Sequence, residues 1–391
     1  MSSLCHAKTF RASDLTKKLV SNPPPMPDLT TVPFGSFFSP HMLTIEFQNN
    51  VWSSPHIGPL KPLELPPHAS CLHYGLECFE GLKAYADIED INKVSRGESL
   101  GTHRRLRLFR PECNVARFQS SMARLCFPSF DAAELLKLLE EFVKIEKDYV
   151  PTTLGYSLYL RPTAIGISHS LGAAPAESGM LFVIASPVGS YFSRPVGAST
   201  GAPLGAVRIL VDEVNHRAWP GGIGGFKLGA NYAGPMLMQR EAAKAGFKQV
   251  LWLGPNREVT EIGAMNFMVV WRTPEGTKEM VTAPLDGMIL PGVTRDSILS
   301  LVRGWGLMRV VERSFTIDEM LNALKEGRVI ECFGCGTAAV VTPVNGLRYR
   351  GEDVVIPSPT GEESLCERVF KAIMDIQYGK MPNEWSRLLH A

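Results

Sequence analysis

The sequence has no long apolar run and almost no net charge. A helix that crosses a bilayer needs about 20 consecutive apolar residues, and the nearest candidate, the strand-like run 180–186, is far shorter. Lys and Arg total 40 against 39 for Asp and Glu, so no net field draws the chain to nucleic acid or to an anionic membrane. We therefore expect neither nucleic acid nor a membrane among its partners.

Cysteines are few and scattered. Eight occur in 391 residues, with no apolar secretory segment in front of them, which indicates free thiols in a reducing compartment rather than a disulfide scaffold. The first twenty residues carry four basic side chains against one acidic one, which is typical of a weak organellar transit signal or of a solvated tail. Because no Arg-rich amphipathic pattern follows, we expect the tail and a cytoplasmic protein, with a mitochondrial one as the alternative.

The length of the chain and the positions of its Pro- and Gly-rich stretches predict two domains. With 45% hydrophobic residues, 391 residues exceed what one core needs. The Pro-rich stretch within residues 1–33 cannot join a helix or an interior strand, so this segment is predicted to be an N-terminal arm that is flexible or draped over the surface. Residues 34–192 are predicted to form a small α+β domain, the polar, Pro- and Gly-dotted stretch 193–205 an interdomain linker, and 206–391 a large α/β domain.

Apolar periodicity places the elements within these domains. In the first half it predicts strands at 42–47, 106–109, 156–161 and 179–186 and helices at 113–126 and 131–149. In the second half it predicts strands at 206–211, 248–253, 266–271, 279–282 and 308–312 and helices at 234–245, 295–303, 317–325 and 362–376. The charged, Ser- and Gly-containing segment 86–105 is interpreted as an exposed loop of unassigned role.

The most informative stretch is Gly221-Gly-Ile-Gly-Gly-Phe-Lys227-Leu-Gly-Ala-Asn-Tyr232. Four glycines let the backbone approach a ligand closely, and a single lysine follows among apolar and small neighbours. Burial or a nearby cation lowers a lysine pKa, and the neutral amine attacks an aldehyde to give a Schiff base. A surface loop with a solvated lysine is the alternative. A phosphate-binding P-loop is excluded because Phe226 and Leu228 flank the lysine, and a dinucleotide site because its fingerprint differs.

This string resembles the lysine region of branched-chain aminotransferases of the eukaryotic type, which are pyridoxal-phosphate enzymes of fold type IV, like D-amino-acid aminotransferase. The resemblance extends in order along the chain from about Phe34 to the C-terminal helix. It is carried by Phe34-Gly, His41-Met-Leu, Leu72-His-Tyr-Gly, Phe79-Glu-Gly-Leu-Lys-Ala, Leu108-Phe-Arg-Pro, Tyr159-Leu-Arg-Pro, Thr260-Glu-Ile-Gly-Ala-Met-Asn, Leu290-Pro-Gly-Val-Thr-Arg and Gly336-Thr-Ala.

The resemblance implies the cofactor and its site. Lys227 would hold pyridoxal 5'-phosphate as a Schiff base and then move the proton as general base and acid. Glu261 would keep the pyridine nitrogen protonated, and Tyr232 would hydrogen-bond the phenolate. The phosphate would be held by cations, a helix N-terminus and a hydroxyl, namely Arg110, Arg217, Leu290, Gly292, Val293, Thr294 and Thr337.

The resemblance also implies the substrate site and the reaction. The substrate carboxylate would be held by Tyr159, Arg161, Thr337 and Ala338, and the aliphatic side chain by Phe34 and Phe79 together with Tyr74, Leu171 and Ala173 of a partner subunit. The expected enzyme is a homodimeric branched-chain-amino-acid transaminase that moves the amino group of leucine, isoleucine or valine to 2-oxoglutarate. The alternatives are another fold-type-IV enzyme such as D-amino-acid aminotransferase, which Tyr159-Leu-Arg-Pro disfavours, and a non-catalytic phosphate-ligand-binding protein.

Two departures from the family pattern concern regulation and specificity. Relatives of the human type carry a redox Cys-x-x-Cys after Gly-Thr-Ala, where this chain has Ala339 and Thr342, so that switch is expected to be missing. Cys332 and Cys335 lie upstream, where two inert buried thiols are expected and a metal site is not, since a second ligand pair is absent nearby. Ala264 replaces a threonine of some relatives, so the preferred branched-chain substrate stays open. The sequence also leaves the direction of flux open.

Overall fold

A computed structural model describes residues 9–168, 170–189 and 204–391, which divide into two compact units. The prediction of a two-domain mixed fold is confirmed. The sequence indicated one crossing between domains, at 193–205, most of which lies outside the described residues. The chain also returns to the first unit at Lys227–Ala230 and Asp375–Ala391. These returns depend on pairings between distant segments, which local periodicity does not encode.

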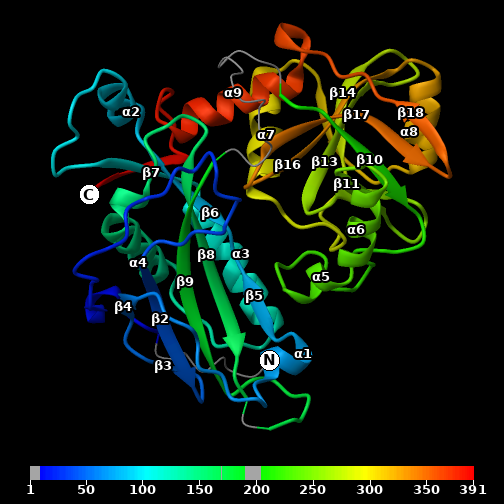
Figure 1. Ribbon diagram of the computed structural model, residues 1–391. Helices are drawn as coiled ribbons and strands as arrows, with labels where there is room; N and C mark the ends of the chain where they lie inside the picture. Colours follow the sequence, from blue (N-terminus) through cyan, green and yellow to red (C-terminus); the bar gives the residue numbers. More distant parts are fainter. Residues whose placement is uncertain (1–8, 169, 190–203) are drawn as a thin grey trace. The chain divides into compact units, whose positions relative to one another are not determined.

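The first unit contains a largely antiparallel sheet in the order β1-β4-β2-β9-β8-β6-β7-β19, with β3 on β2 and β5 on β8. The long strands β8 and β9 run side by side (Figure 1). Buried and half-buried positions alternate along the first part of β9, as expected for a strand with one face on a core. The strands are β1 (Thr16–Lys17), β2 (His41–Gln48), β3 (Val51–Trp52), β4 (His56–Pro59), β5 (Glu77–Phe79), β6 (Leu82–Ala86), β7 (Arg105–Phe109), β8 (Ser157–Gly166), β9 (Ser178–Val188) and β19 (Ser386–His390).

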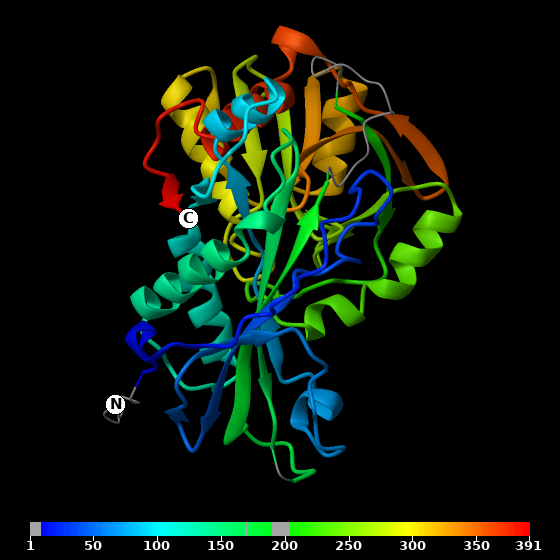
Figure 2. The same ribbon diagram turned by 60° about the vertical axis from the view of Figure 1, so that its left-hand side comes forward.

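Among the helices of the first unit, α3 and α4 pack against each other, as the turned view also shows (Figure 2). The interpretation of 86–105 as a loop was wrong over α2. Asp87 caps that helix by accepting from the Glu89 N–H, and Ile91 is buried on its inner face, so a short amphipathic helix forms within a charged segment. The helices are η1 (Ala12–Asp14), α1 (Ser70–Tyr74), α2 (Ile88–Ser95), α3 (Pro111–Arg124), α4 (Ala132–Ile145) and η2 (Lys147–Tyr149).

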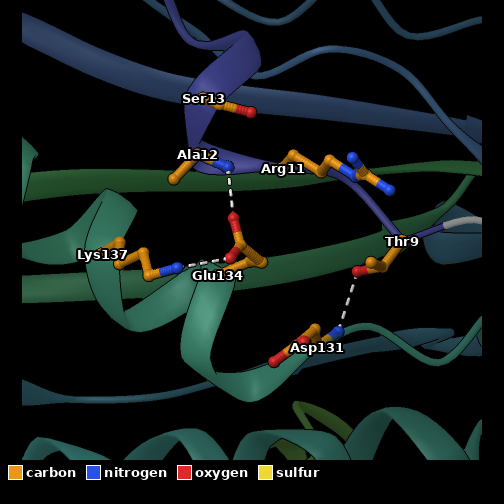
Figure 3. A pocket seen from close by; sticks show the side chains of 7 residues that line it. All are labelled: Thr9, Arg11, Ala12, Ser13, Asp131, Glu134 and Lys137. Atoms are coloured by element: carbon orange, nitrogen blue, oxygen red, sulfur yellow. Dashed lines mark hydrogen bonds and ion pairs between the residues drawn. The ribbon is translucent and has the colours of Figure 1, made fainter.

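The predicted N-terminal arm lies against the first unit in the part that the structure describes, from Thr9 onward, as in the draped alternative. Phe10 is 2% exposed, and β1 pairs in parallel with β4. Figure 3 shows the shallow pocket where the arm meets α4: the Ala12 N–H donates to Glu134 and the Asp131 N–H donates to Thr9. A buried aromatic anchor and these hydrogen bonds hold the start of the arm, and the Tyr149 hydroxyl donates to the Pro24 carbonyl in its Pro-rich part.

The second unit is built on a sheet that closes on itself. Its order is β12-β11-β10-β17-β16-β13, and β12 also pairs with β13, while β14 and β15 extend the edge and β18 pairs with β17. Apolar side chains such as Ile209, Leu251 and Phe267 fill its core. The strands are β10 (Val207–Asp212), β11 (Gln249–Leu253), β12 (Val259–Ile262), β13 (Met265–Arg272), β14 (Lys278–Thr282), β15 (Arg309–Glu312), β16 (Val329–Gly336), β17 (Val340–Tyr349) and β18 (Glu352–Val355).

Helices surround this closed sheet. The one predicted at 317–325 is α8, where Thr316 caps the N-terminus by accepting from the Glu319 N–H, and Ile317 and Met320 are buried. In the described part of the chain, no helix combines the length and the hydropathy needed to cross a membrane. The helices are α5 (Ala230–Ala233), α6 (Met236–Lys244), α7 (Val293–Trp305), α8 (Ile317–Lys325), η3 (Gly361–Glu363) and α9 (Leu365–Gln377).

Candidate active site

Lys227 is held by its main chain within the first unit. Its N–H donates to the Ser121 hydroxyl at 2.9 Å, and its carbonyl accepts from the Phe79 N–H at 3.0 Å. Leu228 forms an antiparallel bridge with Cys78 on β5. The residue at the end of the glycine-rich loop is therefore fixed on both sides, and its side chain is half-buried.

The side chain of Lys227 lies in a cluster of aromatic and cationic groups. Its Nζ is 4.8 Å from the centroid of the Phe79 ring, and the Arg161 guanidinium carbon is 4.6 Å from the same centroid. Arg161 Nη2 donates to the Tyr159 hydroxyl at 3.0 Å, and the Phe34 ring meets the Tyr159 ring edge-on at 5.6 Å. The structure thus brings together four residues predicted to bind substrate and the predicted catalytic lysine.

Arg161 has spare hydrogen-bonding capacity. Its Nε is buried and has no hydrogen-bond partner among the described residues. A buried donor without a partner carries a desolvation cost that an anionic ligand removes. The same corner needs Gly81, because a Cβ there would lie 1.9 Å from the Tyr159 hydroxyl. This arrangement suits a carboxylate beside an apolar ring.

Three further predicted substrate residues form an exposed group of the same unit. The Tyr74 hydroxyl, at the end of α1, donates to the Leu171 carbonyl. Tyr74 is 43% and Leu171 64% exposed, and Ala173 is exposed as well. Apolar side chains left this open on one chain are typical of surfaces that another protein covers.

In the second unit, Glu261 on β12 is a buried carboxylate with defined partners. It is 3% exposed, and its Oε2 lies 2.9 Å from Arg217 Nε. Its Oε1 accepts from the side-chain amide of Asn266 at 2.9 Å and from the Leu290 N–H at 3.0 Å. A carboxylate with a cation and two donors is stabilised in its charged form.

Arg217 also fastens the glycine-rich loop. Its Nη2 donates to the carbonyl of Met288 at 2.7 Å and of Gly224 at 3.3 Å. The Asn231 side chain donates to the carbonyls of Ile223 and Phe226, each at 2.9 Å. These bonds hold the glycine-rich loop within the second unit up to Phe226, the residue before Lys227.

A helix N-terminus lies near Glu261 in space, because the Leu290 N–H that donates to this carboxylate stands two residues before its N-cap. Gly292 occupies the N-cap position of α7 and offers no side chain to its first N–H groups, so a ligand could accept from them. A Cβ at Gly292 would lie 2.1 Å from the Asn266 side-chain oxygen, so only glycine fits. Asn266 also donates to the Leu290 carbonyl, which links this helix start to the glutamate. Thr294, in the first turn, is buried.

The remaining predicted residues are placed as follows. Thr337 and Ala338 form the tight turn between β16 and β17 and are half-buried, and Tyr232 is half-buried on α5. Arg110 belongs to the first unit, where it starts α3 with a left-handed φ of 46° and lies 4.7 Å from the centroid of the Trp385 ring. Its role toward a phosphate stays a prediction.

Sequence reasoning did not nominate Ser121, Asn231 or Asn266. The two asparagines stood inside the quoted motif strings, and their position there was the available signal. Ser121 lies in a helix more than a hundred residues away from Lys227 along the chain, so no pattern in the sequence pointed to it. All three act by hydrogen-bonding main-chain or carboxylate groups, which residue type and spacing do not reveal.

The two strand cysteines are buried free thiols, as predicted. Burial raises the pKa of Cys335 to about 12 and holds the pKa of Cys332 well above its ordinary value. They stand three positions apart on β16, so their side chains point to opposite faces. A thiol that stays protonated reacts slowly with oxidants.

We therefore expect mild oxidants not to gate activity reversibly through this pair. Peroxide or oxidised glutathione followed by dithiothreitol should leave the rate of wild type and of Cys332→Ser/Cys335→Ser within about twofold of each other. The measurement is turnover before oxidation, after it and after reduction. A reversible loss in wild type that the double variant lacks would contradict the expectation.

Comparison with known proteins gives one family. The profile of the family described as amino-transferase class IV matches residues 101–347. A Dictyostelium discoideum branched-chain-amino-acid aminotransferase is 46% identical over 92% of this chain and 90% of its own length. A mitochondrial one from Bos taurus is 44% identical over 97% and 92%, and relatives named as cytosolic match too.

Solved structures agree in fold. The branched-chain aminotransferase of Thermoproteus uzoniensis, solved with norvaline, superposes with a TM-score of 0.67 and 21% identity, covering 89% of this chain and 99% of that chain. The branched-chain amino acid aminotransferase of Escherichia coli has a TM-score of 0.65 and 22% identity, covering 89% and 98%. A further enzyme of that name, solved with pyridoxamine 5'-phosphate, has a TM-score of 0.66 and 23% identity, covering 88% and 97%.

Proposed function

This chain belongs to the class IV aminotransferases, and we propose that it transfers the amino group of leucine, isoleucine or valine to 2-oxoglutarate. The products are branched-chain 2-oxo acids and glutamate. The observation that carries the proposal is Lys227 beside the Phe79 ring, with the unsatisfied Arg161 Nε on the same ring. An amine and an N–H donor for a carboxylate, both next to an apolar ring, match an α-amino acid with a hydrocarbon side chain. The names of the full-length relatives agree.

The residues present fit pyridoxal 5'-phosphate. The buried carboxylate of Glu261, held by Arg217, suits a protonated ring nitrogen, and the N-terminus of α7 with Thr294 suits a phosphate. Tyr232, Arg110 and the turn at Thr337 and Ala338 remain the proposed further contacts. When bound, this cofactor supplies an electron sink for the negative charge that develops at the substrate α-carbon.

The chain's own groups then do the acid and base work. Lys227 would attach the cofactor, take the proton from the substrate α-carbon and return it, since an amine freed in place is the base closest to that atom. Arg161 and the Tyr159 hydroxyl would hold the substrate carboxylate, and Phe34 and Phe79 would keep water from its side chain. Buried apolar contact stabilises by about 0.8 kcal/mol per methylene, which favours aliphatic donors.

We also propose a homodimer in which Tyr74, Leu171 and Ala173 complete the side-chain pocket of the partner. Their exposure on one chain supports this. Light scattering should give about twice the mass of one chain, and a change of Leu171 to Asp should lower both the dimer fraction and turnover. The compartment, expected to be the cytosol, stays a prediction.

The direct test is amino transfer from L-leucine to 2-oxoglutarate by the purified protein with added cofactor. Formation of glutamate and the 2-oxo acid supports the proposal. Activity with D-amino acids alone would favour a D-amino-acid aminotransferase. Cofactor binding with no transfer in either case would favour a phosphate-ligand-binding protein.

Arg161→Ala is expected to impair glutamate and 2-oxoglutarate more than leucine. Besides the carboxylate that all substrates share, Arg161 would also meet the second carboxylate of these two, and a charge-assisted hydrogen bond contributes about 1.5–3 kcal/mol, or roughly 10- to 100-fold. Half-reaction rates for each amino acid, in wild type, Arg161→Ala and the charge-conserving Arg161→Lys, measure the difference. Equal losses for leucine and glutamate would show instead that Arg161 holds only the carboxylate that both share.

A further inference from the structure

One face of α3 carries three buried polar side chains to which the proposed function assigns no role. Asn114, Arg117 and Ser121 are 3%, 9% and 0% exposed. Spacings of three and four residues place them in one stripe along the helix. Each loses hydration on burial, so each requires a polar partner.

The partner of the first two is Glu80, which is 1% exposed. Arg117 binds its carboxylate with two bonds, Nε to Oε1 at 2.6 Å and Nη2 to Oε2 at 2.8 Å. The Asn114 amide donates to the same carboxylate at 2.9 Å and to the Gly81 carbonyl at 3.2 Å. This is a fully engaged buried ion pair of the bidentate kind.

The stripe ends on the catalytic lysine. The Ser121 hydroxyl accepts from the Lys227 N–H at 2.9 Å, and the Lys227 carbonyl accepts from Phe79, the residue before Glu80. The Glu80 N–H donates to the Pro162 carbonyl at 2.8 Å, on the strand that carries Tyr159 and Arg161. A single set of bonds thus connects the lysine, the ring beside it and the substrate strand.

The network also places a charge beside the lysine. Burial by itself would raise the pKa of Glu80, but Arg117, and then Lys227 and Asn114, hold that pKa below its ordinary value, so the carboxylate stays ionised. The Glu80 charge attracts a positive charge at Lys227, and the Arg117 charge repels it. Other titratable groups of this unit lie close by: Arg161 shares the Phe79 ring with the lysine, Tyr159 lies against Arg161, and Glu77 and Cys78 stand on β5, which bridges to Leu228.

We propose that Glu80 and Arg117, with Asn114 and Ser121, are positioning residues for the amino transfer. They hold the Lys227 main chain and the Phe79 ring in register with the substrate strand and balance the charge at the lysine nitrogen. Stability alone does not account for the pair, because apolar replacements of a buried ion pair are often neutral or stabilising. The inference rests on the proposed function for its kinetic readout only.

The kinetic test compares Glu80→Gln, Arg117→Met and the apolar pair Glu80→Leu/Arg117→Met. Misplacing a reacting group by about 1 Å costs roughly 100-fold, so kcat should fall about 10- to 100-fold while KM for leucine changes less than about threefold. The matched control is Asp87→Asn/Arg107→Met. That ion pair of the same unit has an N–O distance of 2.5 Å and exposures of 1% and 14%, and it lies outside the hydrogen bonds of the network. Its kcat should stay near wild type.

The spectroscopic test is a pH titration of the visible absorption of the cofactor-loaded protein, which reports the proton on the Lys227 nitrogen. Glu80→Gln should move the midpoint to lower pH, because Arg117 is left unbalanced. Arg117→Met should move it much less, because the buried Glu80 then loses the cation that keeps it ionised and both charges disappear together. The apolar pair should lie between them and should melt close to wild type, so it remains informative if a single variant does not fold.

Unmoved midpoints, or rates that fall only in proportion to melting temperature as in the control, would overturn the positioning role. If wild type transfers no amino group but the midpoint of Glu80→Gln still moves to lower pH and that of Arg117→Met moves much less, the network stands and the proposed reaction fails. If wild type is active and the apolar pair keeps its kcat, the network fails and the reaction stands.

Discussion

Lys227→Ala should abolish amino transfer between L-leucine and 2-oxoglutarate. We expect a loss of at least about 10³-fold, because general acid–base catalysis alone contributes roughly 10²–10⁴ and the covalent attachment of the cofactor is lost as well. The main-chain bonds of Lys227 to Ser121 and Phe79 do not involve its side chain, so the fold should persist. Turnover, melting temperature and the visible absorption of the cofactor-loaded protein measure the three effects.

A second buried lysine provides the control. Lys83 on β6 is 7% exposed, and burial lowers its pKa to about 8, so by desolvation alone it would also qualify as a nucleophilic amine. Borohydride reduction followed by peptide mapping should find the cofactor on Lys227 in wild type and in Lys83→Met, and nowhere in Lys227→Ala. Attachment at Lys83 would refute the assignment, whatever the effect on turnover.

The elements that the sequence predicted are those with strong periodicity. The alternation of β9 and the capped, amphipathic α8 were located to within a few residues. The adjacent strands β16 and β17 were missed, because glycines and a proline interrupt them and their pairing partners lie far along the chain. The helix α2 was missed because its charged composition resembles that of a loop, although Asp87 supplies a standard cap.

In the candidate site, too, some residues could be predicted from the sequence and others could not. Lys227 and Glu261 stood in strings distinctive enough to be named, and each lies among the kinds of groups that its chemistry needs. The supporting side chains were not named, since Asn266 and Ser121 act through hydrogen bonds to groups that only the fold brings near. Packing also decides how exposed an arginine is. The sequence therefore could not show that the Arg161 Nε is buried without a hydrogen-bond partner among the described residues.

Glu261→Gln is expected to keep the bound cofactor and to lose roughly 10²- to 10³-fold in kcat, the cost of removing one preorganised electrostatic group. The amide oxygen can still accept from the Leu290 N–H, as Oε1 does now, so the geometry around α7 should survive. The amide nitrogen would then face Arg217, where two donors meet without an acceptor, and the charge that favours a protonated ring nitrogen is gone.

Glu331→Gln supplies the matched control for that change. Glu331 is a 2% exposed glutamate of the same unit that accepts from the Leu365 and Cys366 N–H groups at the start of α9. It has no place in the proposed chemistry, so its variant should lose stability without a comparable loss of kcat. Glu261→Gln should melt no lower than Glu331→Gln and keep cofactor occupancy near that of wild type by absorption. Its half-reaction should nevertheless be slow with leucine and glutamate alike, because both use the same ring nitrogen. Near-normal half-reactions in Glu261→Gln would assign the carboxylate to holding Arg217 and the glycine-rich loop rather than to the cofactor.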